Sequence, residues 1–292
     1  MTDTCYIEDL RRATANIDTM TAITHAQALK KLAADILVQT LDEDLARLLA
    51  DTMARARHDA SIAANPSASV LAPLLRRWNC VLQAGDDAAS PLYRDKTAVA
   101  LAILLHKYGI ADAGVADRAD AAIDALNDAV ALSDDFHRKT AAIKTAFLHT
   151  PPAPLKRAPG LPDSLTFYRA GDVVSYRLDG HYYAAYVHHC AQTNQSAVIE
   201  FYDAVFDHVP AIDELRDKPA RGRRYNDGSV RIERMSVAGM KFMPDPAGQF
   251  VLIKACMETP PGTAHLRESV GLYAASDVFD LQDSVDKMFE RS

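Results

Sequence analysis

The sequence predicts an α+β fold, in which an N-terminal all-α helical bundle precedes a C-terminal small twisted β-sheet, or partly open barrel, with one or two helices. Residues 1–149 are rich in Ala and Leu at helical spacing, whereas residues 164–292 contain short runs of alternating β-branched and aromatic residues. Residues 150–163 hold five prolines and one glycine. Because helices and strands require different apolar periods, we expect an α-helical domain at 1–149, a Pro-rich linker at 150–163 and a β-rich domain at 164–292.

The helical domain is predicted to contain about six helices. Apolar residues at helical spacing predict one helix over His25 to Leu41. Thr40 and Glu43 have the spacing of a capping box, which places the start of the next helix there, and that helix runs toward Asn65-Pro66. Residues 115–131 and 133–149 form two further amphipathic segments.

A central helix is predicted between Ser90 and Gly109. Ser90 and Pro91 supply an N-cap and a first-turn proline, the apolar run Val99 to Leu105 follows, and Gly109 stands where a helix C-terminus favours glycine. Pro151-Pro152 prevents helix from continuing into the linker, because proline lacks the N–H donor.

The C-terminal domain begins with a predicted β-hairpin. Val173 to Leu178 and His181 to His189 alternate in character around Asp179-Gly180, the pair best suited to a two-residue type I′ turn. We expect one hairpin face to pack on a core and the other to remain open. The strand candidates are 171–178, 181–189, 197–203, 230–235 and 249–256, and the helix candidates are 207–215 and 277–289.

Composition restricts the function classes. The chain has 32 Lys and Arg against 39 Asp and Glu, a formal net charge of −7, which favours a basic protein surface over nucleic acid as partner. The N-terminal residues lack the apolar segment of a secretory signal, and no apolar run is long enough to span a bilayer. The four cysteines show no paired spacing. We therefore expect a cytoplasmic protein with reduced thiols and no membrane association.

Two constellations could support catalysis or phosphate binding. His188-His189-Cys190 offers metal-ligand atoms, but adjacent strand residues point to opposite faces, so the sequence predicts no metal site there. A basic loop could hold phosphate, but it lies in an acidic chain that has no Gly-rich phosphate motif. We expect no catalytic residue and no cofactor. The loop consists of Lys218, Arg221, Arg223 and Arg224, with Arg231 and Arg234 on the following strand.

A third constellation is acidic and aromatic. Glu200 and Tyr202 share a strand face, with Phe201 turned toward the core, and further acids follow in the chain. Carboxylates suit general acid–base work and equally suit an inhibitor steered onto a basic enzyme site. Because no His, Lys or Gly-rich loop completes a catalytic site, we interpret the cluster as partner-binding. Its residues are Glu200, Tyr202, Asp203, Asp207, Asp213 and Glu214.

Residues 167–257 resemble a known family. Gly171 to Val174, Asp179-Gly180 with Tyr182-Tyr183, Val198 to Asp203, and Pro210 with Asp213 to Leu215 are similar to the immunity protein twenty-six family of bacterial polymorphic toxin systems. The resemblance implies a β-rich inhibitor that binds a cognate toxin in the cytosol by stoichiometric occlusion and without turnover. It transfers no catalytic residue. The acidic net charge favours a nuclease as that toxin, because an acidic inhibitor suits a basic, phosphate-binding site. Two alternatives remain: a hydrolase or metal-dependent enzyme using Cys or His of the C-terminal half, and an α-helical adaptor or scaffold.

Overall fold

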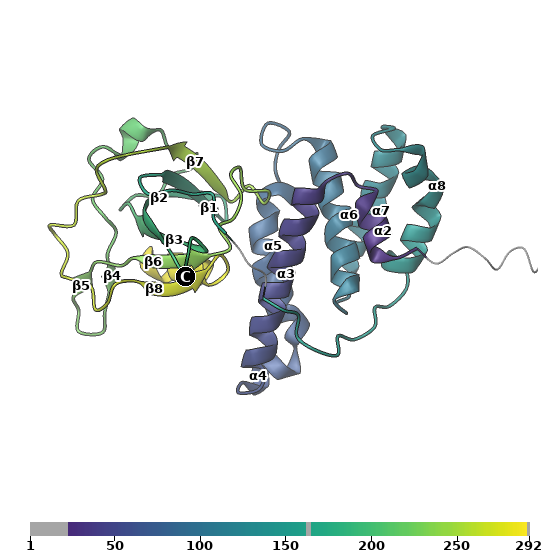
Figure 1. Cartoon of the computed structure of the whole chain (residues 1–292), viewed down its shortest axis with the longest axis horizontal. Coiled ribbons are helices and arrows are strands. Elements are labelled where there is room, and N and C mark those ends of the chain that lie inside the picture. Colours follow the sequence, from purple (N-terminus) through teal and green to yellow (C-terminus); the bar gives the residue numbers. More distant parts are fainter. Residues whose placement is uncertain (1–22, 162–164, 291–292) are drawn as a thin grey trace, which may run out of the picture.

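The computed structural model describes residues 23–161 and 165–290 and places the N-terminal helices on one side of the sheet domain (Figure 1). The α+β prediction is confirmed, with helices mostly in the N-terminal half and strands in the C-terminal half. The N-terminal helices are α2 (His25–Lys30), α3 (Asp35–Arg55), α4 (Ala60–Ala64), α5 (Pro66–Leu82), α6 (Pro91–Lys107), α7 (Ala113–Asp128) and α8 (Asp134–Ile143), followed by the π-helical turn η1 (Lys144–Leu148).

The start of the bundle differs from the prediction. The expected helix over 25–41 is divided into α2 and α3, and Ala33 between them has a φ of 46°. Thr40 does not begin a helix, because it lies inside α3 and its hydroxyl donates to the Ile36 carbonyl at 2.8 Å. The apolar stripe continues through both helices, so its periodicity could not reveal the break. A capping box is present at Thr24 and Gln27 instead.

The central helix α6 has the predicted ends. The Ser90 hydroxyl caps the Tyr93 N–H, Pro91 is the first helical residue, and Gly109 follows the helix with a φ of 78°. A Cβ at Gly109 would lie 2.7 Å from the Ala153 carbonyl oxygen. The first part of the Pro-rich segment therefore packs closely against the end of α6. Residues 162–163 of the predicted linker lie outside the described residues.

The sheet has the order β7-β1-β2-β3-β6-β8 and does not close into a barrel. Neighbouring strands are antiparallel except β6 and β8, which are parallel. Its strands are β1 (Val173–Leu178), β2 (His181–Ala191), β3 (Ser196–Phe201), β6 (Met235–Ala238), β7 (Phe250–Lys254) and β8 (Ala274–Asp277), and β4 (Arg223–Arg224) pairs with β5 (Val230–Arg231) separately.

The predicted hairpin is present, whereas two other elements differ from expectation. Asp179 and Gly180 have φ values of 48° and 81°, as a type I′ turn requires. The run 230–235 contains only β5 and the first residue of β6, and the helix expected at 207–215 is a single 3₁₀ turn, η2 (Ile212–Leu215). The C-terminal helix is α9 (Asp280–Met288), within the expected 277–289.

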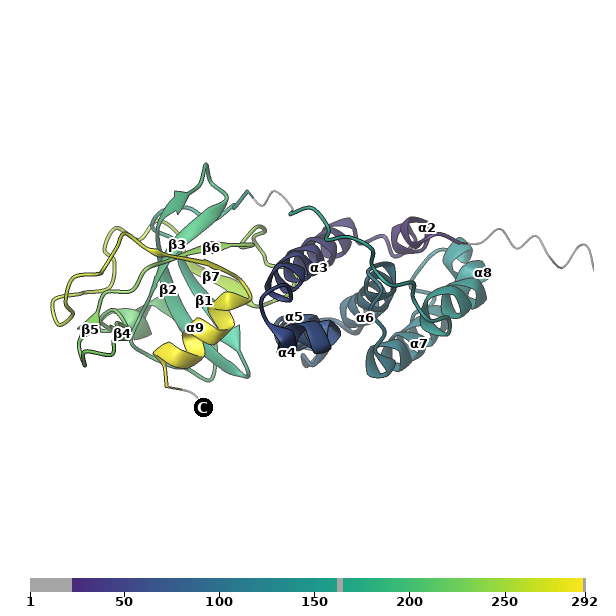
Figure 2. The ribbon, with the colours of Figure 1, turned by 90° about the horizontal axis from the view of Figure 1, so that it is seen from below.

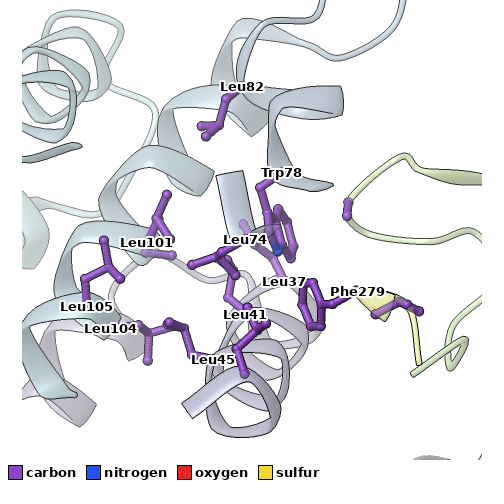
Figure 3. Close-up of a cluster of buried hydrophobic side chains, with 14 of the residues drawn as sticks. Leu37, Leu41, Leu45, Leu74, Trp78, Leu82, Leu101, Leu104, Leu105 and Phe279 are labelled. Carbon is purple, nitrogen blue, oxygen red and sulfur yellow. The ribbon is translucent and has the colours of Figure 1, made fainter. Parts of the chain in front are cut away.

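The two halves share one hydrophobic core. Figure 3 shows Phe279, from the segment before α9, in the same cluster as Leu41, Leu45 and Trp78 of the helical half. Figure 2 shows helix α9 lying across the sheet with its N-terminal end toward the bundle, and its Gln282 amide donates to the Pro73 carbonyl at 3.1 Å. Apolar side chains of the predicted helical domain therefore pack directly against those of the predicted β-rich domain.

A buried arginine joins the halves. Arg77 of α5 is 1% exposed and donates to Asp44 of α3 at 2.9 Å, to Asp245 at 2.8 Å and to Gln249 at 3.0 Å. Burial alone would lower the pKa of the Arg77 guanidinium, but the charges of Asp245 and Asp44 outweigh it and the pKa is raised. The charged arginine thus fixes the segment before β7 against the helical bundle.

In the part of the chain that the structure describes, no helix combines the length and apolar character needed to cross a membrane.

Candidate protein-binding groove

The predicted acidic and aromatic cluster is not an open face. Glu200 is fully buried and Tyr202 is 3% exposed. The strand parity was correct, since Phe201 belongs to the main core and Tyr202 to a second cluster on the opposite face. That opposite face is covered by residues after β3, including Leu215 of η2, which alternation along a single strand could not reveal. The expectation that Glu200 and Tyr202 are accessible on this face is therefore wrong in this structure.

Glu200 has basic partners inside the protein. Its Oε2 lies 2.7 Å from Nε2 of His188, and its Oε1 lies 3.7 Å from Nε of Arg234. Burial, followed by the nearby Tyr186 and Glu200, raises the pKa of the Tyr202 phenol to about 12. These contacts make Glu200 the centre of a buried polar cluster beneath the covering segment.

The other acids of the predicted cluster lie at the surface but are paired locally. Hydrogen bonds to Asp207 and Glu214 raise the pKa of His208 above its ordinary value. A surface acid held in a short-range pair has less charge available to steer a partner. The pairs are Asp203 with Arg221, Asp207 and Glu214 with His208, and Asp213 with Arg216.

The basic loop is also internally paired. Arg221 donates to the Met288 carbonyl at 2.7 Å as well as to Asp203. Its neighbours have carboxylates at salt-bridge distance, which a bound phosphate would have to displace. The pairs are Arg223 with Glu233, Arg224 with Glu290 and Arg231 with Asp227.

Neither Cys80 nor Cys190 is activated as a nucleophile. Burial raises the pKa of the Cys80 thiol to about 11 and also raises the pKa of Cys190, whose Sγ contacts the Tyr168 carbonyl oxygen. Cys5 lies outside the described residues. Within residues 23–161 and 165–290, no group of three or more His, Cys, Asp or Glu side chains is placed to hold a metal ion.

A large hollow lies where the halves meet. It has a volume of about 1060 Å³ and is lined by the start of α3, the loop between α5 and α6, the first turns of α6, residues 242–248 and β7. Three of its apolar side chains are well exposed: Ile36 at 56%, Leu92 at 41% and Val251 at 39%. We call this hollow, lined by both halves, the junction groove.

Hydrogen bonds fix the wall of the junction groove. The Tyr93 hydroxyl of α6 donates to the Pro246 carbonyl at 2.8 Å. The Asp245 carboxylate, held by Arg77, accepts from the backbone N–H groups of Gln249 and Phe250, each at 3.1 Å. A wall tied at several points to a buried ion pair is formed before any ligand arrives.

Sequence reasoning missed the junction groove because its residues come from segments far apart in the chain. Alternation and capping signals identify elements singly, and they located α6 and the run 249–256 that contains β7. Which elements meet is decided by tertiary packing, here by Arg77 and the shared core. The apolar run Phe250 to Ile253 falls within the strand candidate 249–256, but it does not show which elements pack beside that strand.

No family model, no curated protein and no solved structure matches the chain.

Proposed function

We propose that this chain is a protein-binding module that neutralises a cognate bacterial toxin in the cytosol by stoichiometric occlusion, with the partner held in the junction groove. The toxin part of the proposal is supported by the resemblance of residues 167–257 to an immunity family. The binding part is supported by the groove itself.

The observation that carries the proposal is the set of exposed apolar side chains in a fixed hollow. Ile36, Leu92 and Val251 come from three separate elements and remain exposed in one place. An apolar surface gathered in this way is typical of a site for a protein or ligand, because covering it removes apolar area from water. The helical half contributes much of the lining, so both halves are required.

One observation favours a second candidate function, a hydrolase. The fully buried Glu200 carboxylate orients His188 at 2.7 Å, and a carboxylate that orients a histidine is a common element of general-base sites. The nearby Cys190 has a raised pKa, which argues against its use as a thiolate nucleophile. The substitution His188→Gln discriminates the two functions: it would abolish a hydrolase and leave stoichiometric protection unchanged.

The groove is tested by the substitution of two exposed apolar residues with acids. In cells that express a toxin neutralised by the unmodified chain, Ile36→Asp with Leu92→Asp is expected to abolish protection, because charges would have to be buried under the partner. The matched control is Leu272→Asp, since Leu272 is 86% exposed and precedes β8 at the opposite end of the sheet. Full protection by the folded double variant would contradict the proposal, as would a toxin-bound complex whose stoichiometry departs from a fixed ratio.

A further inference from the structure

Strand β7 ends the sheet beside the junction groove. It pairs with β1 on one side, and in the described part of the chain no strand pairs with its other side. Figure 1 shows β7 at the upper border of the sheet. Its sequence, Phe250–Lys254, is apolar apart from the final lysine, and an uncovered apolar edge strand is a template for pairing with another chain.

The register identifies which backbone groups face outward. Arg177 donates its N–H to the Gln249 carbonyl, and Ser175 is opposite Val251. Because hydrogen-bonded pairs alternate along an antiparallel ladder, Val251 faces β1 whereas Phe250 and Leu252 present their N–H and C=O groups to the open side. The Phe250 N–H already donates a hydrogen bond to the Asp245 carboxylate. The Phe250 carbonyl and both backbone groups of Leu252 therefore remain for a partner strand.

The groove continues from β7 into a basic region. A second hollow of about 530 Å³ shares Ala33 and Lys96 with the junction groove and is also lined by Lys30 and Lys31. Lys31 pairs with Asp135, so its charge is already balanced. Lys30 and Lys96 form no salt bridge with another described residue. The main opposing charge is Asp35 in the first turn of α3, where a carboxylate interacts favourably with the helix N-terminus.

We propose that the partner enters as an extended segment that adds a strand to the open side of β7, with alternate apolar side chains in the junction groove and a carboxylate directed to Lys96. This inference rests on the proposed function and specifies the chemistry of the partner. Backbone hydrogen bonds to Phe250 and Leu252 fix the segment as a strand, the groove accepts every second side chain, and the lysines select an acidic end. A helix cannot pair with the strand edge, and a basic segment would be repelled by the lysines.

The test uses random 12-residue peptides displayed on phage and selected on the full chain. We expect selected sequences to alternate apolar and polar residues, to lack proline and to carry Asp or Glu toward one end. A synthetic copy of one selected peptide is then methylated at each backbone nitrogen in turn. Strand addition predicts that methylation weakens binding by about tenfold at two nitrogens that lie two residues apart, those that donate to the Phe250 and Leu252 carbonyls, and leaves the nitrogen between them unaffected.

Two substitutions in the protein complete the test. Leu252→Pro removes the outward N–H, which an edge strand tolerates structurally, and it should weaken binding by about tenfold, whereas Leu252→Ala keeps the donor and separates that loss from loss of the side chain. Lys96→Glu should weaken binding of the acidic peptide, and a peptide in which Lys replaces the acid should recover binding to this variant. Lys156→Glu, at an exposed position outside the groove, is the control for net charge.

Each outcome separates strand addition from the groove itself. Sensitivity to methylation at all positions or with a helical period, while Ile36→Asp still abolishes binding, would overturn strand addition and leave the groove intact. Selected peptides that bind independently of Ile36 would overturn the proposed function. A dimer of the free chain that becomes a monomer with Leu252→Pro would show that a second copy occupies the edge, and would overturn the inference.

Discussion

Replacement of Arg77 with Met is predicted to destabilise the whole chain strongly. Arg77 is 1% exposed, and its carboxylate partners Asp44 and Asp245 have side chains only 5% and 6% exposed. The substitution removes the cation and leaves two buried negative charges unpaired. Loss of one partner of a buried ion pair costs about 3–5 kcal/mol, which is a large part of the roughly 5–15 kcal/mol that stabilises a typical domain.

The control for this prediction is the adjacent Arg76. Its guanidinium also has two acidic partners, Asp179 and Asp286, but its side chain is 24% exposed. Solvent screens this pair, so Arg76→Met should cost only about 0–1 kcal/mol. The two variants therefore make the same chemical change in a dry and in a wetter environment.

Urea unfolding followed by tryptophan fluorescence measures both variants. The single tryptophan, Trp78, is fully buried and donates its indole N–H to Asp44, so its emission reports directly on the joint between the halves. Addition of Asp44→Asn and Asp245→Asn to Arg77→Met should recover part of the lost stability, because the unpaired charges are removed. A loss below about 1 kcal/mol for Arg77→Met, equal to that of Arg76→Met, would refute the argument that the buried ion pair joins the halves.

Three further predictions concern the helical half and the linker. Burial lowers the folded-state pKa of His25 and of His106 below the unfolded value, so the unfolded state binds more protons below about pH 6.5. The urea concentration at the midpoint of unfolding should therefore fall as the pH is lowered through this range. His106→Gln should make this fall of the midpoint smaller. Gly109→Ala should reduce the free energy of unfolding by about 1–3 kcal/mol, since the residue has a positive φ and the new Cβ would meet the backbone of Ala153. Thermal melts measure this loss. Gly114→Ala, in the first turn of α7, is the control and should leave the stability unchanged or raise it. Trypsin should cleave after the exposed Lys156 or Arg157, and the two pieces should still co-elute in size-exclusion chromatography because they share a core; separate elution would show that the halves are independent.

Local signals predicted the elements that depend on neighbouring residues. Asp179-Gly180 identified the hairpin because a type I′ turn requires positive φ at both positions, and Ser90-Pro91 located the start of α6 because capping is a contact within one turn. The break between α2 and α3 was missed because the apolar stripe is continuous across it. Strand β8 was missed because Ala274–Asp277 shows no apolar alternation and is held as a strand by its pairing with β6.

The candidate site was harder to predict because accessibility depends on segments far apart in the chain. Alternation correctly separated Phe201 from Glu200 and Tyr202, but it could not show that η2 and the adjoining loop cover the second face of the sheet. The junction groove depends on contacts such as Tyr93 with Pro246, which join residues more than a hundred positions apart. A single sequence contains no periodicity at that range.

Hydrogen–deuterium exchange on the complex with the cognate toxin tests the central claim most directly. The account predicts slower exchange on binding at the start of α3, in the α5–α6 loop and over residues 242–254, the segments that line the junction groove or continue from it. Slower exchange confined to residues 200–214 or to the arginine loop at 221–231, with the groove segments unchanged, would contradict it.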